Sequence, residues 1–160
     1  MTIDIGIPES ARIAVAEKLN VFLATSYMVR VKTQNFHWNV EGPHFPMLHS
    51  MFEDQYDTLS GSIDEVAERV RMLGERSVGS MQEFIKHSLV EEATVGGLTE
   101  HAMLTQLHHD HEVLIKSARE FAEFAGAQGD VGNEDFFTSR IQMHEKVAWM
   151  LRATLNAKNM

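Results

Sequence analysis

The chain has 160 residues, of which 44% are hydrophobic and 23% are charged, so it is long enough for one domain with a sizeable core. It contains no cysteine, which excludes disulfides and thiolate metal sites. We find no apolar run of the roughly 18 residues that a membrane span needs, and no N-terminal leader, so we expect a cytoplasmic protein. The net charge of −9 disfavours non-specific binding to nucleic acid and suits a protein that handles cations.

The first half of the chain predicts two long helices, because its apolar residues recur at steps of three and four. Residues 1–8 are expected to be a short N-terminal tail on a single domain that covers 1–160. The first helix is expected over 9–40, where Gly42 and Pro43 end it. The second is expected over 46–73, with Gly74 placed just after its C-cap.

The second half predicts a short helix and two more long ones. The short helix is expected over 81–88, and the third long helix over 99–125 with Thr99 as its N-cap. The fourth long helix is expected over 134–156, after a turn marked by Gly126, Gly129 and Gly132. The chain therefore predicts an all-α four-helix bundle with a short extra helix between the second and third long helices.

Two histidines and three acids form a pattern that indicates a metal site. They are His37, His49, Glu53, Asp64 and Glu68. From His49 onward the steps are four, eleven and four residues, which keeps these side chains on one stripe of a helix. Imidazole combined with carboxylate suits iron or another first-row divalent metal. A solvated helix face is the competing interpretation of the three acids taken alone.

Distance limits how this row can bind one ion. The fifteen residues from His49 to Asp64 span about 22 Å along a helix, whereas metal–ligand bonds are about 2 Å long. A single copy of the helix therefore cannot supply both residues to one ion. Two copies packed antiparallel about a two-fold axis near Tyr56 and Asp57 would bring His49 of one chain level with Asp64 of the other.

Other histidines have simpler interpretations. His111 and His144 fall on core-facing positions, where a hydrogen-bonded structural histidine is the expected role. His108 and Glu112 are four residues apart on one helix face, and we interpret them as exposed polar residues rather than metal ligands. His44 lies in the turn beside Pro43 and is expected to be part of the loop.

Three motifs at fixed spacings resemble the Dps family of ferritin-like mini-cages. They are H-W-N-x-x-G at 37–42, D-x-x-x-E followed by arginine at 64–69, and H-E-K-x-x-W-M-L-R at 144–152. Between the first two stand a histidine twelve residues after His37 and an acid four residues later. The resemblance covers nearly the whole chain.

The resemblance implies a homododecameric shell built from two-fold dimers. Such a shell would oxidise Fe(II), preferentially with hydrogen peroxide, store the ferric mineral inside and so protect the cell from oxidative damage. His37, His49 and Glu53 would come from one subunit, and Asp64 and Glu68 from its two-fold partner. Position 53 often carries aspartate in the family, so the glutamate here is a departure.

Two accessory features are expected, the first from its position in the sequence and the second from the resemblance. Trp38, next to the site, would stack over it or intercept radicals. A negative pore for iron entry at a three-fold axis would be lined by Asp130, Glu134 and Asp135.

Two alternative functions remain. Direct DNA binding and nucleoid association would need a basic tail, but the N-terminal segment carries only Arg12 against Asp4 and Glu9, and the C-terminal end offers only Arg152 and Lys158. A conventional di-iron bundle would use Glu-x-x-His pairs, and the one pair of this kind, Glu41 to His44, crosses Gly42 and Pro43 and cannot be helical.

Overall fold

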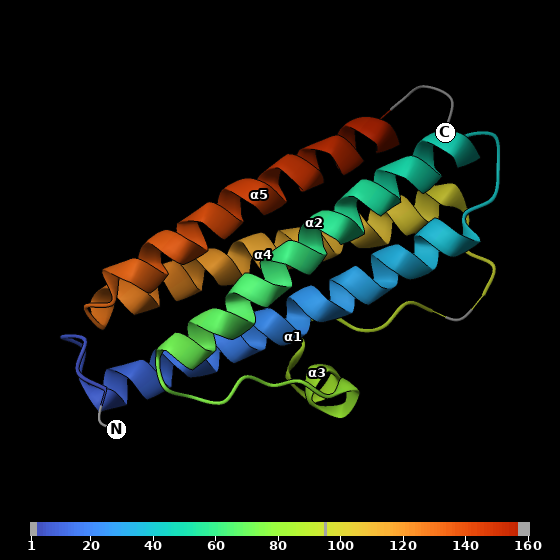
Figure 1. Cartoon of the computed structure of the whole chain (residues 1–160). Helices are drawn as coiled ribbons and strands as arrows, with labels where there is room; N and C mark the ends of the chain where they lie inside the picture. The colour runs from blue at the N-terminus through green and yellow to red at the C-terminus, as the bar shows by residue number, and fades with distance from the viewer. Residues whose placement is uncertain (1–2, 95, 157–160) are drawn as a thin grey trace.

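The computed structural model describes residues 3–94 and 96–156, and within these ranges it contains five helices and no strand. This confirms the predicted all-α class. The helices are α1 Glu9–Asn39, α2 Phe45–Met72, α3 Met81–His87, α4 Glu100–Ala127 and α5 Val131–Leu155 (Figure 1). No helix among the described residues is both long enough and apolar enough to span a bilayer.

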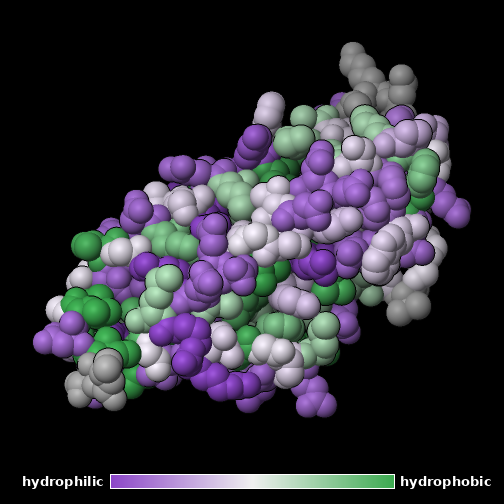
Figure 2. All heavy atoms as spheres, viewed as in Figure 1, coloured by the Kyte–Doolittle hydropathy of each residue, from purple (hydrophilic) through white to green (hydrophobic). Residues whose placement is uncertain are grey.

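The four long helices lie side by side as two antiparallel pairs, α1 with α2 and α4 with α5 (Figure 1). The connection from α2 to α4 runs along the bundle and carries α3, which packs against α1. This is the predicted four-helix bundle with an extra helix in its long crossover. Hydrophilic residues cover most of the face seen in Figure 2, while hydrophobic residues gather at the end where α1 begins.

The core divides into two apolar clusters along the bundle. The larger one surrounds Phe22 and Phe137, whose rings meet edge to face at 5.6 Å. The smaller one surrounds Phe36 and Phe52, near the turn between α1 and α2. Each long helix contributes to both clusters, because its apolar residues recur at helical spacing and form one stripe along its length.

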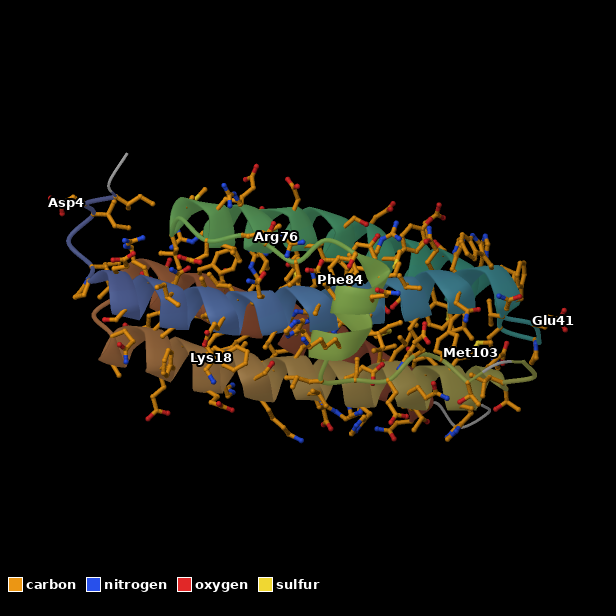
Figure 3. All side chains as sticks on the ribbon, turned by 90° about the horizontal axis from the view of Figure 1, so that it is seen from below. Asp4, Lys18, Glu41, Arg76, Phe84 and Met103 are labelled. Carbon is orange, nitrogen blue, oxygen red and sulfur yellow. The ribbon has the colours of Figure 1, made fainter. Side chains whose placement is uncertain are left out.

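Helix α3 is short but well anchored. Ser80 and Glu83 form a capping box that satisfies the backbone N–H groups at its first turn. Phe84 points from α3 toward α1, where its ring stacks on Tyr27 at 4.1 Å (Figure 3). The crossover is fixed to α1 by this aromatic contact together with hydrogen bonds: Asn20 donates to the carbonyl oxygen of Arg76, and the backbone N–H of Leu89 donates to the hydroxyl of Thr25.

The turn between α4 and α5 is tighter than the sequence predicted. Gly126 and Gly132 are helical, and only Gly129 has a left-handed φ, of 76°. Helix α5 begins at Val131 rather than at residue 134, because the Asp130 carboxylate accepts hydrogen bonds from the backbone N–H and the side-chain amide of Asn133. The capping residue, which we had not recognised from the pattern, decides where the helix starts.

Two glycines offer a matched test of the end of α2. Gly74 has a φ of 93°, and a Cβ placed on it would lie 2.3 Å from Cδ1 of Ile3 in the N-terminal tail. We therefore expect Gly74→Ala to lower the free energy of unfolding by about 1–2 kcal/mol. Gly61 is helical with open space at its Cβ, so Gly61→Ala should instead stabilise by about 0.5–1 kcal/mol. Urea unfolding of both variants measures the difference, and equal effects of the same sign would refute the docking of the tail on Gly74.

Candidate metal centre

His37 and His49 form a stacked pair where α1 ends and α2 begins. Their ring centroids are 3.8 Å apart and their planes are inclined by 18°. Nδ1 of His37 donates to the carbonyl oxygen of His49, and Nδ1 of His49 donates to the carbonyl oxygen of His37, each over 2.8 Å. Because a carbonyl can only accept, both Nδ1 atoms carry the proton.

The reciprocal hydrogen bonds prepare both rings as ligands. With Nδ1 protonated, each neutral imidazole has its lone pair on Nε2, the atom left to bind a metal. Hydrogen bonding of the distal ring nitrogen to a carbonyl is also what orients metal-binding histidines in proteins. His37 is only 7% exposed, and the rings of His49 and Tyr56 pack against it.

Tyr56 borders the same pair, and the sequence reasoning did not assign it to the site. Its ring meets His37 edge to face at 5.3 Å, and the guanidinium of Arg30 lies 5.8 Å from its centroid. Loss of solvent around the hydroxyl, followed by the negative charges of Glu53 and Asp57, raises the pKa of Tyr56. The phenol beside the histidines therefore stays protonated at neutral pH.

The three acids of the row all lie exposed on α2. Among the described residues, Glu53, Asp64 and Glu68 have no hydrogen bond or ion pair from their carboxylates within the protomer. Their neighbour Glu65 differs, because Arg140 binds it. The row thus presents three carboxylates that no residue in the described part of the protomer pairs with.

One protomer does not bring the two halves of the row together. Helix α2 is continuous from Phe45 to Met72, so the separation of about 22 Å between His49 and Asp64 holds. Within residues 3–94 and 96–156, no three histidine, aspartate or glutamate side chains converge closely enough to hold an ion. Completion of the site by a second protomer stays a prediction.

His44 has a larger role than the loop position suggested. Its backbone N–H and its Nδ1 both donate to the carboxylate of Glu100, each over 2.9 Å. The two bonds fix the turn that joins His37 to His49 onto the first turn of α4. Glu100 lies 56 residues away in sequence, so no local spacing signals this contact.

The residues predicted for the pore lie around the start of α5. Asp130 is 3% exposed and is engaged in capping the helix, while Glu134 and Asp135 are exposed. Glu134 also lies against Gly126, where a Cβ would be 2.8 Å from its Oε2. Of the three, Glu134 and Asp135 therefore have free access to solvent in the protomer, and the pore itself stays a prediction.

Three further expectations concern single residues. Trp38 is 66% exposed next to His37, and its role toward radicals stays a prediction. His108 and Glu112 are only partly exposed, contrary to the expected exposed positions, and Nε2 of His108 lies 3.8 Å from Oε1 of Glu112. Arg12, the one basic residue near the N-terminus, is 7% exposed and donates to the carbonyl oxygen of Leu73 over 2.6 Å, while Lys158 lies outside the described residues.

Comparison with known proteins identifies the family. Residues 16–160 match the model of the ferritin family, described as a ferritin-like domain. The chain is 36% identical to DNA protection during starvation protein 2 of Bacillus anthracis, over 89% of this chain and 97% of that protein. It superposes on the crystal structure of Dps from Vibrio cholerae with a TM-score of 0.92 and 32% identity, over 97% of each chain. The chain belongs to the Dps family of ferritin-like proteins.

A third relative of this Dps protein is a low temperature-induced protein of Nostoc sp., 38% identical over 98% of this chain and 88% of that protein. The Vibrio cholerae protein is described as a member of a broad superfamily of ferritin-like diiron-carboxylate proteins. Dps membership supports iron storage and DNA protection as general roles and confirms the resemblance drawn from the motifs.

Proposed function

We propose that this Dps protein is a ferroxidase that oxidises Fe(II) with hydrogen peroxide and stores the ferric product inside a homododecameric cage. The observation that carries the proposal is the reciprocally hydrogen-bonded pair of His37 and His49, which leaves both Nε2 atoms free for a metal. In the proposed dimer, Glu53 belongs to the same protomer as the histidines, and Asp64 and Glu68 come from the two-fold partner.

The donor set fits iron as a substrate. Neutral imidazole nitrogens and ionised carboxylates are ligands for Fe(II), and sites of this kind leave positions open. Hard carboxylate oxygens favour Fe(III) over Fe(II), which makes bound iron easier to oxidise. Glu53, Asp64 and Glu68 are exposed on α2, so a second protomer can reach them. In the free protomer their carboxylates are in contact with water, so none of them is a buried charge without a partner.

The stoichiometry with peroxide favours a site that handles two electrons. Two Fe(II) ions, one hydrogen peroxide and two protons yield two Fe(III) ions and two water molecules. Delivery of both electrons avoids the hydroxyl radical that a single Fe(II) ion would release.

We assign Trp38, exposed beside His37, the task of intercepting radicals that escape. Consuming Fe(II) and peroxide would protect DNA without contact, which suits a chain whose one N-terminal arginine is buried.

An anaerobic titration with Fe(II), followed by peroxide, tests the proposal. We expect the parent protein to bind Fe(II) saturably and to oxidise it rapidly, and His37→Ala and Asp64→Ala each to lower the initial rate at least about tenfold. The matched control is Glu123→Ala, which removes an exposed carboxylate on α4 away from the row and should leave the rate unchanged. Undiminished oxidation by both site variants would refute the assignment.

A further inference from the structure

A layer of polar residues separates the two apolar clusters of the bundle. Each long helix places at least one buried polar side chain between residues of the two clusters, as α4 does with His111 between Leu107 and Leu114. These residues are Lys32 and Thr33 in α1, Gln55 in α2, Asp110 and His111 in α4 and His144 in α5, all of them buried. The layer takes no part in the proposed iron chemistry, so its presence needs another explanation.

His111 and His144 join α4 to α5 within this layer. Both are 0% exposed, and their Nδ1 atoms are 2.9 Å apart. A hydrogen bond between two imidazole nitrogens requires one N–H donor and one bare acceptor. The arrangement therefore holds the pair as two neutral rings of opposite tautomer.

The surroundings provide no place for an additional proton. The Nε2 atoms of both histidines are buried without a hydrogen-bond partner, and Phe22 lies edge-on to His144 at 5.9 Å between centroids. One added proton would create a cation whose new N–H group has no acceptor. A second proton would turn both Nδ1 atoms into donors and abolish the bond between the helices.

The charged groups around the pair disfavour protonation as well. Burial, followed by the charge of His108, lowers the pKa of His111 to about 3. Burial, followed by the charges of His111 and Arg140, lowers the pKa of His144 well below its usual value.

The nearby acids are already engaged by other cations. From α2, Glu65 is bound by Arg140, and between α1 and α4 the carboxylate of Asp110 is bound by Lys32. In the described part of the chain, neither histidine has a carboxylate partner.

We propose that the pair of His111 and His144 is an acid-sensitive lock that holds α4 against α5 at neutral pH and fails on acidification. The inference is independent of the proposed ferroxidase activity, because it concerns the stability of the bundle. In the unfolded chain both imidazole rings are hydrated and can bind protons. Lowering the pH therefore shifts the folding equilibrium toward the unfolded state.

The sign and size of the effect follow from linkage. The pKa of each histidine is lower in the folded protein than the value of 6.5 expected in the unfolded chain. The stabilising contribution is therefore complete above pH 6.5 and is progressively lost below it. Each histidine shifts the unfolding equilibrium about tenfold per pH unit in this range, so the pair should shift it about a thousandfold between pH 7.5 and 5.0.

Urea unfolding at pH 7.5 and 5.0 tests the lock. The double variant His111→Leu/His144→Leu replaces both partners by apolar groups, which keeps the site satisfied. We expect the unfolding equilibrium of the parent to shift toward the unfolded state about a thousandfold more than that of the double variant over this interval. His109→Gln, which removes an exposed histidine from the same helix, should behave like the parent. Equal pH dependence of parent and double variant would overturn the proposal.

A measurement on the unmodified protein covers the case in which the double variant does not fold. Exchange of the imidazole C2 hydrogen, followed residue by residue by mass spectrometry, reports the titration of each histidine in the assembled protein. We expect His111 and His144 to exchange slowly, with no transition down to pH 5. A transition of either buried histidine near pH 6.5 in the folded protein would refute the lock.

Discussion

We expect His49→Ala and Asp64→Ala, each of which should lower the ferroxidase rate on its own, to regain part of that rate when the two variants assemble in the same cage. The reason is the distance of about 22 Å between these residues along α2, which would put them in different sites of the proposed two-fold dimer. In a mixed dimer, the intact histidines of one protomer meet the intact Asp64 of the other. The second site of that dimer carries both defects.

The fraction of sites that should recover can be calculated. If the two variants are unfolded, mixed equally and reassembled, half of the dimers are mixed and each has one intact site, so about a quarter of all sites recover. Initial rates of iron oxidation after addition of peroxide measure the fraction. A mixture of His37→Ala with His49→Ala is the control, because both ligands belong to the same half-site and the mixture should stay inactive. Failure of the first mixture to exceed this control would exclude a shared site.

Loss of Lys32 will destabilise the protein more than loss of any exposed cation. Nζ of Lys32 lies 2.7 Å from Oδ2 of Asp110, and the two residues are 5% and 3% exposed. Burial raises the pKa of Asp110, and the hydrogen bond from Lys32 opposes that shift. Lys32→Ala leaves a buried carboxylate without its partner, so we expect a loss of about 3–5 kcal/mol in the free energy of unfolding by urea titration.

Two comparison variants separate the missing charge from the missing packing. The double variant Lys32→Met/Asp110→Leu removes both charges and should recover most of the stability, since apolar replacements of a buried ion pair are often neutral. Lys18→Ala breaks a partly exposed pair with Glu120 at 3.7 Å and should cost less than about 1 kcal/mol. A double variant as unstable as Lys32→Ala would show that packing, rather than charge, is responsible.

The helices and the ligand row were predictable because their information is local. Apolar residues at steps of three and four predicted every helix to within three residues of its observed ends. The spacing from His49 to Glu68 placed the acids on one helix, and helix rise alone showed that one protomer cannot complete the site. Gly74 and Thr99 were also placed correctly, because caps depend on residues adjacent to the helix end.

The remaining features depend on contacts between segments far apart in the chain. The fixed tautomers of His37 and His49, the attachment of His44 to Glu100 and the burial of Arg12 against Leu73 each join different segments.

By itself, the sequence determined the helices, the family and the chemical types in the candidate site, because periodicity and spacing are properties of a single segment. Only the tertiary structure decided which nitrogen of each imidazole is free and which polar groups are buried together. Hydrogen-bond direction and burial are set by neighbours that folding brings within a few ångströms, and no local pattern encodes them.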